Sequence, residues 1–138
     1  MKIFCHHIYE YKKGLRNLVL CTLHTEHLKS AIARLERNRI AYLVRHVSDK
    51  KVNVFFGLRE CVDIVRGFGD KPLNTFTDEE DFILGIMLGY GRVKQCRRYL
   101  KRKGHSIPES DPYENLAFAN NACGQAASRL FPSECLCE

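Results

Sequence analysis

The sequence predicts an α+β fold with a ferredoxin-like split β-α-β core, in the order β-α-β-β-α, and two helices added at its carboxyl end. Three observations lead to this prediction. A compact apolar run precedes an amphipathic helical pattern, two further apolar runs flank a short turn, and a second helical pattern follows. With 138 residues, of which 45% are hydrophobic and 28% charged, the chain is long enough to build one core.

The first strand is predicted over residues 17 to 23, Asn-Leu-Val-Leu-Cys-Thr-Leu, because this run is apolar and rich in residues that favour strands. The apolar residues that follow repeat at the i, i+3, i+4 and i+7 spacing of one helix face: Leu28, Ala31, Ile32 and Leu35. This spacing predicts a helix that ends near Asn38.

A hairpin is predicted next. The apolar runs 41 to 47 and 52 to 56 flank Ser-Asp-Lys-Lys at 48 to 51, which has the composition and the length of a turn. A second helix is predicted from about residue 58 to 68, with Val62, Val65 and Phe68 facing inward and Gly57 at its cap.

Such a core lacks the fourth strand of a ferredoxin-like sheet, so one edge of the strand at 18 to 23 would be unpaired. Two interpretations stay open for what covers this edge. Residues 3 to 9 could fold back as a strand, or a second subunit could supply the contact.

The two added helices follow a linker at 69 to 74. Thr77 to Glu80 form a capping box, and the helix predicted from 81 to 88 is apolar on nearly every side, which indicates burial on more than one face. A basic helix is predicted from 92 to 103, ending at Gly104. Its apolar positions Val93, Cys96 and Leu100 are expected to dock on the core, while Arg98, Lys101 and Arg102 point outward.

The net charge of +6 is a local property of that basic helix. Seven of the 22 basic residues fall between 92 and 103, a segment without an acid, so the remaining 15 nearly balance the 16 acidic residues. Such a run is typical of a solvated face, or of a contact with nucleic acid or an acidic protein. The candidate contact residues are Arg92, Lys94, Arg97, Arg98, Lys101, Arg102 and Lys103.

A transition-metal site is a second hypothesis. Histidine and carboxylate ligands gather near the amino terminus and at the start of the first predicted helix: His6, His7, Glu10, His24 and His27. The chain has no H-E-x-x-H or C-x-x-C spacing, so surface or packing histidines are the competing interpretation.

The seven cysteines are expected to be thiols rather than a disulfide framework, because their number is odd and no export signal or membrane-spanning run is present. This predicts a cytosolic protein with no membrane partner. Cys61 and Cys96 are the candidate nucleophiles, although each thiol is more simply a packed side chain. Glycine-rich nucleotide motifs are missing.

Residues 1 to 104 are therefore predicted to form a single α+β domain. Residues 105 to 138 begin with helix breakers and carry little periodic apolar sequence, so they are predicted to be an appended tail with one short helix at 113 to 121.

Several uninterrupted segments resemble a small bacterial family catalogued only as a domain of unknown function. They are Phe4 with His-His-Ile-Tyr-Glu at 6 to 10, Lys-Lys-Gly-Leu-Arg-Asn-Leu-Val-Leu at 12 to 20, Val-Asn-Val-Phe-Phe-Gly at 52 to 57, Glu-Glu-Asp-Phe-Ile-Leu-Gly at 79 to 85, Leu-Gly-Tyr at 88 to 90, Gln95-Cys96 and Arg98-Tyr99. The resemblance covers residues 3 to 103, and the tail departs from it.

The resemblance implies a chain of about 120 residues, close to the usual size of one domain, with three strands and five helices. It also implies a homodimer with no assigned activity. A count of three strands favours leaving residues 3 to 9 out of the sheet.

The leading hypothesis for function is a homodimeric ferredoxin-like binding or regulatory module without catalytic activity, since no acid-base, nucleophile or cofactor constellation stands out. One alternative is a metal-dependent protein or enzyme centred on His6, His7 and Glu10. The other is a nucleic-acid-binding protein that uses the basic helix at 92 to 103.

Overall fold

The structure is a computed structural model that describes residues 1–107 of the chain. Within them it contains three strands, five α-helices and one short 3₁₀ helix. Their bounds are α1 (Lys2–Lys12), β1 (Leu18–His24), α2 (Thr25–Arg37), β2 (Ala41–His46), β3 (Lys51–Gly57), α3 (Arg59–Gly67), η1 (Leu73–Thr75), α4 (Asp78–Met87) and α5 (Arg92–Arg102). The α+β class is confirmed, and so is the predicted order β-α-β-β-α followed by two helices, from β1 to α5; α1 precedes it.

The three strands form one antiparallel sheet in the order β1-β3-β2. Leu20 on β1 and Leu43 on β2 are both register partners of Phe55 on β3. β1 and β2 are therefore parallel to each other and separated by β3, which is the split β-α-β arrangement that the sequence predicts.

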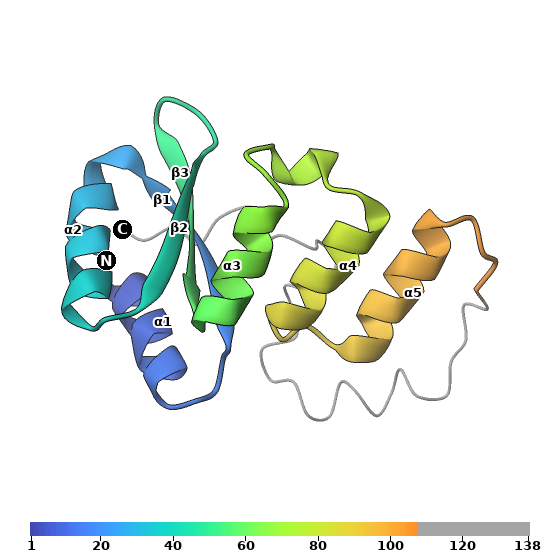
Figure 1. Cartoon of the computed structure of the whole chain (residues 1–138), viewed down its shortest axis with the longest axis horizontal. Helices are drawn as coiled ribbons and strands as arrows, with labels where there is room; N and C mark the ends of the chain where they lie inside the picture. Colours follow the sequence, from blue (N-terminus) through green and yellow to red (C-terminus); the bar gives the residue numbers. More distant parts are fainter. Residues whose placement is uncertain (108–138) are drawn as a thin grey trace.

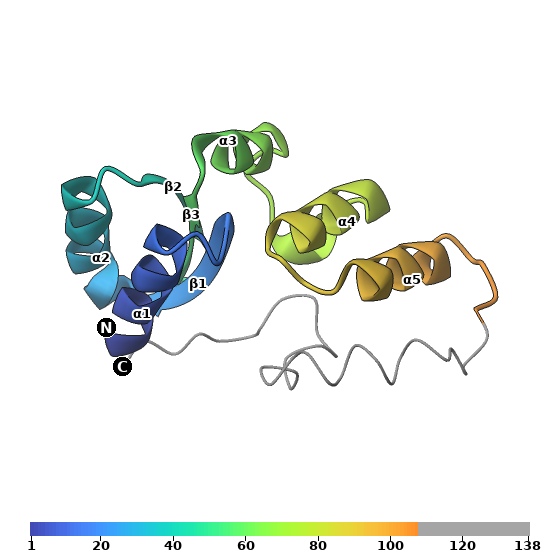
Figure 2. The ribbon, with the colours of Figure 1, turned by 90° about the horizontal axis from the view of Figure 1, so that it is seen from below.

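Helices cover both faces of this sheet (Figures 1 and 2). α1 and α2 pack on one face against Val19, Cys21 and Leu23 of β1, whereas α3 and α4 pack on the other face against Leu18 and Leu20. A ferredoxin-like fold keeps its two helices on one face. Here β3 has large apolar side chains on both faces, including Phe55 and Phe56, so each face needs its own cover.

Residues 3 to 9 are helical, so the interpretation of this segment as a strand is wrong. As a strand it would place His6 on the same face as Phe4 and Ile8, and the imidazole would be buried with them. In α1, Phe4 and Ile8 are buried against the sheet while the side chain of His6 stays 65% exposed. The helix thus separates apolar from polar residues, and Phe4 meets Phe56 with ring centroids 5.3 Å apart.

α4 lies between the sheet and α5. Leu84 and Leu88 join the core beneath the sheet, and Asp81 and Gly85 are buried on the side that meets α5. The buried positions 81, 84, 85 and 88 share one broad face of α4, and Ile83 on the other side is 38% exposed, so full burial is limited to one face rather than the several that were predicted. The capping box is present, because the Glu80 amide donates to Thr77 Oγ1 and the Thr77 amide donates to Glu80 Oε1, both at 3.2 Å.

The predicted docking face of α5 is wrong. Val93 is 59% and Leu100 is 40% exposed, and Cys96 is exposed with them, whereas Gln95 is buried against Gly85 of α4. The polar side of α5 therefore packs on α4, and the apolar stripe faces away from it.

The predicted tail, including the short helix at 113 to 121, lies outside the described residues apart from positions 105 to 107. The boundary at residue 104 stays a prediction. Within residues 1–107, no helix has both the length and the apolar character needed to cross a bilayer.

Candidate functional site

β1 presents one unpaired edge of the sheet. The amide of Leu58 donates to the Asn17 carbonyl, and the amide of Thr25 donates to the Lys50 carbonyl. Both bonds fit the β1-β3 register, so the odd-numbered residues of β1 direct their backbone groups toward β3. The even-numbered residues direct theirs away from it: Leu18, Leu20, Thr22 and His24.

This outward row has no backbone partner among the described residues, because β1 is the terminal strand of the sheet. α1 does not close the edge, since it packs on the face of the sheet (Figure 2). Within residues 1–107, the position of the missing fourth strand is thus open to pairing with another strand.

Glu10 on α1 is the centre of a cluster of polar and charged side chains. His6 Nε2 lies 2.8 Å from Glu10 Oε1, and Arg16 Nη1 lies 3.5 Å from Glu10 Oε2. His7 Nδ1 lies 3.8 Å from Glu10 Oε2 and 3.4 Å from Arg16 Nη1. The predicted ligands His6, His7 and Glu10 therefore come together, but the guanidinium of Arg16 lies beside the carboxylate where a metal cation would have to bind.

His24 and His27 do not complete a metal site with this cluster. His24 caps the start of α2, and His27 lies 3.5 Å from Glu26 in the first turn. Within residues 1–107, no three His, Cys, Asp or Glu side chains are placed so that they could hold a metal ion together. The geometry therefore gives the metal hypothesis no support.

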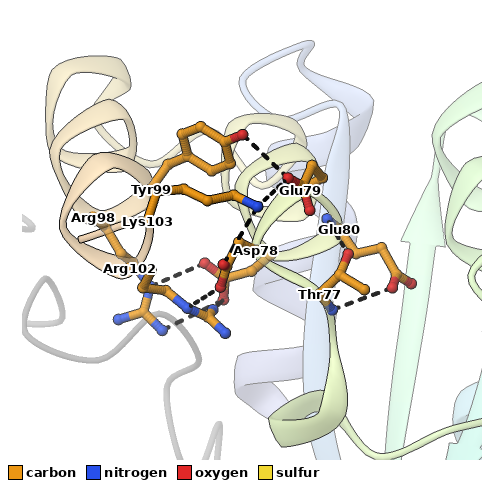
Figure 3. A network of polar contacts seen from close by, with 9 residues as sticks. Thr77, Asp78, Glu79, Glu80, Arg98, Tyr99, Arg102 and Lys103 are labelled. Atoms are coloured by element: carbon orange, nitrogen blue, oxygen red, sulfur yellow. Dashed lines mark hydrogen bonds and ion pairs between the residues drawn. The ribbon is translucent and has the colours of Figure 1, made fainter. Parts of the chain in front are cut away.

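The basic helix α5 is partly neutralised by the acidic first turn of α4 (Figure 3). Arg98 Nε donates to Asp81 Oδ2 at 3.0 Å, and Arg102 Nη1 lies 3.0 Å from Asp81 Oδ1. Lys103 Nζ lies 2.6 Å from Glu79 Oε1, which lowers the pKa of Glu79 and raises that of Lys103. At least three of the seven candidate nucleic-acid contacts, Arg98, Arg102 and Lys103, are thus engaged within the chain.

These pairs explain why α5 packs by its charged side. The side chain of Asp81 is only 2% exposed, and a buried carboxylate is costly unless cations and hydrogen bonds compensate it. Turning the apolar stripe of α5 inward would leave that carboxylate without its two arginines. The predicted outward orientation of Arg98 and Arg102 is wrong for this reason.

The family described as "Protein of unknown function (DUF2023)" matches residues 2–102. The chain belongs to that family. No curated protein matches the chain. The resemblance seen in the sequence is therefore confirmed, and so are its three strands and five α-helices within the described residues.

Sequence reasoning missed the acceptors of the α5 cations in this DUF2023 chain. The signal was present, because four consecutive acids begin one helix at 78 to 81, seven cations lie on the next helix at 92 to 103, and only a short connection joins the two helices. Helices joined by so short a loop pack side by side and antiparallel, which brings the first turn of α4 to the last turn of α5. Opposite charges at these two positions predict ion pairs across the helix hairpin.

Of the two candidate nucleophiles, Cys61 lacks the environment of a reactive thiolate. Partial burial, and next the nearby charge of Glu60, raise the pKa of the Cys61 thiol, which keeps it protonated. Cys96 is exposed on the apolar stripe of α5 rather than packed as expected.

Acid is expected to weaken the start of α4. A hydrogen bond from Lys71 Nζ to Glu80 Oε1, 2.6 Å long, holds the pKa of Glu80 below its ordinary value of 4.5. The Glu80 carboxyl binds a proton more readily in the unfolded chain than in the folded one. The stabilisation by its ion pair with Lys71 is therefore complete above a pH of about 4.5 and is lost as the pH falls below that value. Lys71→Met should lower the free energy of unfolding by about 1 kcal/mol at neutral pH and by less at about pH 3.

Urea denaturation at the two pH values measures this difference. Lys29→Met on the exposed side of α2 is the matched control and should cost little at either pH. An equal loss for Lys71→Met at both pH values would contradict the assigned role of the Glu80 carboxylate.

Proposed function

We propose that this chain is a homodimeric binding module without catalytic activity, and that the outer edge of β1 forms the contact between the two copies. The observation that carries the proposal is the outward row of backbone groups at Leu18, Leu20, Thr22 and His24. An unpaired strand edge is a template for another strand, and the two-fold dimer is the commonest arrangement of identical chains.

The sequence of β1 supports a second copy as the occupant. Leu-Val-Leu-Cys-Thr-Leu-His contains no proline, lysine, arginine or acid, which are the residues that usually protect an edge. The helix and loop that lead into β1 also expose three large apolar side chains, Ile3, Tyr9 and Leu15, which are available to widen the contact.

Strand geometry supports the same arrangement. In an antiparallel pair centred on Cys21, Leu20 of one protomer lies opposite Thr22 of the other, and Leu18 lies opposite His24. All four residues are even-numbered, so every outward backbone group meets another outward group. The two sheets then join into one continuous sheet, with the same residues used on both sides of the two-fold axis.

Light scattering on the full chain tests the dimer. Its mass should be twice 16.0 kDa at micromolar concentration. Thr22→Pro removes one outward amide at the centre of the edge and should yield monomers, because proline cannot donate a hydrogen bond to a second strand. The bonds between β1 and β3 should be kept, since they are made by the odd-numbered residues of β1.

His24→Pro is the second variant, because the backbone of His24 already has φ −68° and ψ 142°, values that proline adopts. It should also weaken the dimer while keeping the far-UV circular dichroism of the fold. A wild-type chain that stays monomeric would contradict the proposal, and so would a folded His24→Pro protein whose dimer dissociates no more readily than the wild type.

Two features support binding rather than catalysis. The Cys61 thiol stays protonated, and the Glu10 carboxylate is already paired with Arg16. A cytosolic, bacterial setting is part of the same proposal, and the lack of disulfides among the cysteines of residues 1–107 is in keeping with it. Nucleic-acid binding by α5 remains a prediction, and the ion pairs of Arg98, Arg102 and Lys103 with α4 speak against it.

A further inference from the structure

A groove of about 380 Å³ opens on the face of the sheet that carries α3. Its floor is formed by the ends of β2 and β3 near their hairpin, and its wall by the segment that leads from the end of α3 through η1 to Phe76. This volume falls in the range of about 300 to 1,000 Å³ that is typical of sites for small molecules.

A row of polar side chains crosses the sheet at the floor of the groove. Thr22 on β1 and Arg45 on β2 are both register partners of Asn53 on β3. The next row on the same face is apolar and consists of Leu20, Phe55 and Leu43. The sheet therefore changes from apolar to polar where α3 ends and the groove begins.

Asn53 is the central residue of this row. It is only 7% exposed, although it interrupts the apolar run of β3. The Thr22 hydroxyl donates to Asn53 Oδ1 at 2.7 Å, and no described residue accepts a hydrogen bond from Asn53 Nδ2. Asn53 Nδ2 is not among the buried side-chain atoms that lack a partner in the described residues, so it keeps access to solvent and can donate to a ligand in the groove.

Arg45 supplies a positive charge beside this amide. Its Nε lies 3.7 Å from Asp70 Oδ1, but the Asp70 side chain is 84% exposed, so this pair neutralises the guanidinium weakly. The described lining also includes His46 and Lys71, whose ammonium group is paired with Glu80. It contains no aspartate or glutamate. The floor thus favours a negatively charged group.

The remaining walls are apolar. Phe55 and Val65 are buried at the base, and Phe76 lies at the side with Leu73 next to it. Lys71 Nζ lies 5.6 Å from the centre of the Phe76 ring, so a cation stands beside this aromatic wall. The lining therefore offers apolar and aromatic contacts to one part of a ligand, and positive charge and hydrogen-bond donors to an anionic part.

We propose that this groove binds a small organic anion, an aromatic carboxylate, whose carboxylate pairs with Arg45 and accepts a hydrogen bond from Asn53 Nδ2. Arginine and carboxylate match each other in shape and charge, and the pairing is stronger where the surroundings are apolar. The site is independent of the proposed dimer, because Arg45 lies on β2, at the opposite edge of the sheet from β1.

Calorimetric titration of the full chain with 2-naphthoate, and with the uncharged 2-naphthamide as its matched control, tests the site. Naphthoate should bind at least about tenfold more tightly than the amide, because only the carboxylate forms a charge-assisted pair. Arg45→Gln should weaken naphthoate binding by at least about tenfold, whereas Arg66→Gln, on α3 and paired with Asp63, should leave it unchanged.

Amide chemical shifts locate the binding. The signals of Asn53, Phe55 and Asn74 should move on addition of naphthoate. Equal affinities for naphthoate and naphthamide would show only an apolar groove and would overturn the proposal. Three other results would also overturn it: unchanged naphthoate affinity in Arg45→Gln, chemical-shift changes confined to other regions, or no binding at millimolar naphthoate. The comparison of the two ligands uses the natural chain, so it decides the question even if Arg45→Gln fails to fold.

Discussion

Replacing Gly57 with alanine is expected to lower the free energy of unfolding by about 4 kcal/mol. Gly57 ends β3 with φ +151°, and a Cβ atom there would lie 2.2 Å from the backbone carbonyl oxygen of Asn17. The neighbouring amide of Leu58 donates to that same carbonyl at 2.8 Å. The obstructing atom is backbone, so relief of the overlap requires β1 and β3 to separate at the point where the core begins.

Gly14→Ala is the matched control. Gly14 also has a positive φ of +76°, but a Cβ atom there would meet nothing within 4 Å. Its expected cost is that of the backbone conformation alone, about 1 to 2 kcal/mol. Urea denaturation followed by circular dichroism compares the two variants, and equal losses would show that the approach of Gly57 to Asn17 carries no special cost.

Replacing Asp81 with asparagine is expected to lower the free energy of unfolding by about 2 to 4 kcal/mol. The carboxylate is 2% exposed and receives Arg98 and Arg102, whose own side chains are 39% and 33% exposed. Breaking a fully buried pair costs more, but the partial exposure of both arginines lets water compensate them in the variant. The loss should appear first as opening of α5, since the pairs join α5 to α4.

Asp78→Asn is the control for charge at the same end of the helix. Asp78 is 26% exposed and pairs with Arg102 at 2.8 Å, so its removal should cost about 1 kcal/mol or less. Hydrogen exchange should become faster across α5 in Asp81→Asn and change little in Asp78→Asn. Equal exchange in the two variants would contradict the central role given to Asp81.

Local sequence patterns identified most of the fold because each depends on neighbours along the chain. The apolar run before His24, the helical spacing from Leu28 to Leu35 and the capping box at Thr77 predicted a strand, a helix and a helix start within a few residues of their observed positions. The candidate sites were less accessible to this reasoning. Asn53 and Arg45 are eight residues apart in sequence, and only strand pairing makes them neighbours.

From β1 to α5, the sequence by itself determined where strands and helices form, since a period of 2 or 3.6 and a cap are local properties of the chain; α1 was the exception. The tertiary structure decided which surface each element buries. α5 carries both an apolar stripe and a charged side, and the buried carboxylate of Asp81, supplied by α4, selected the charged side. Likewise, α3 packs on the face of the sheet opposite α2 because β3 is apolar on both sides. The sequence of a helix alone does not specify which face of a sheet the helix will cover.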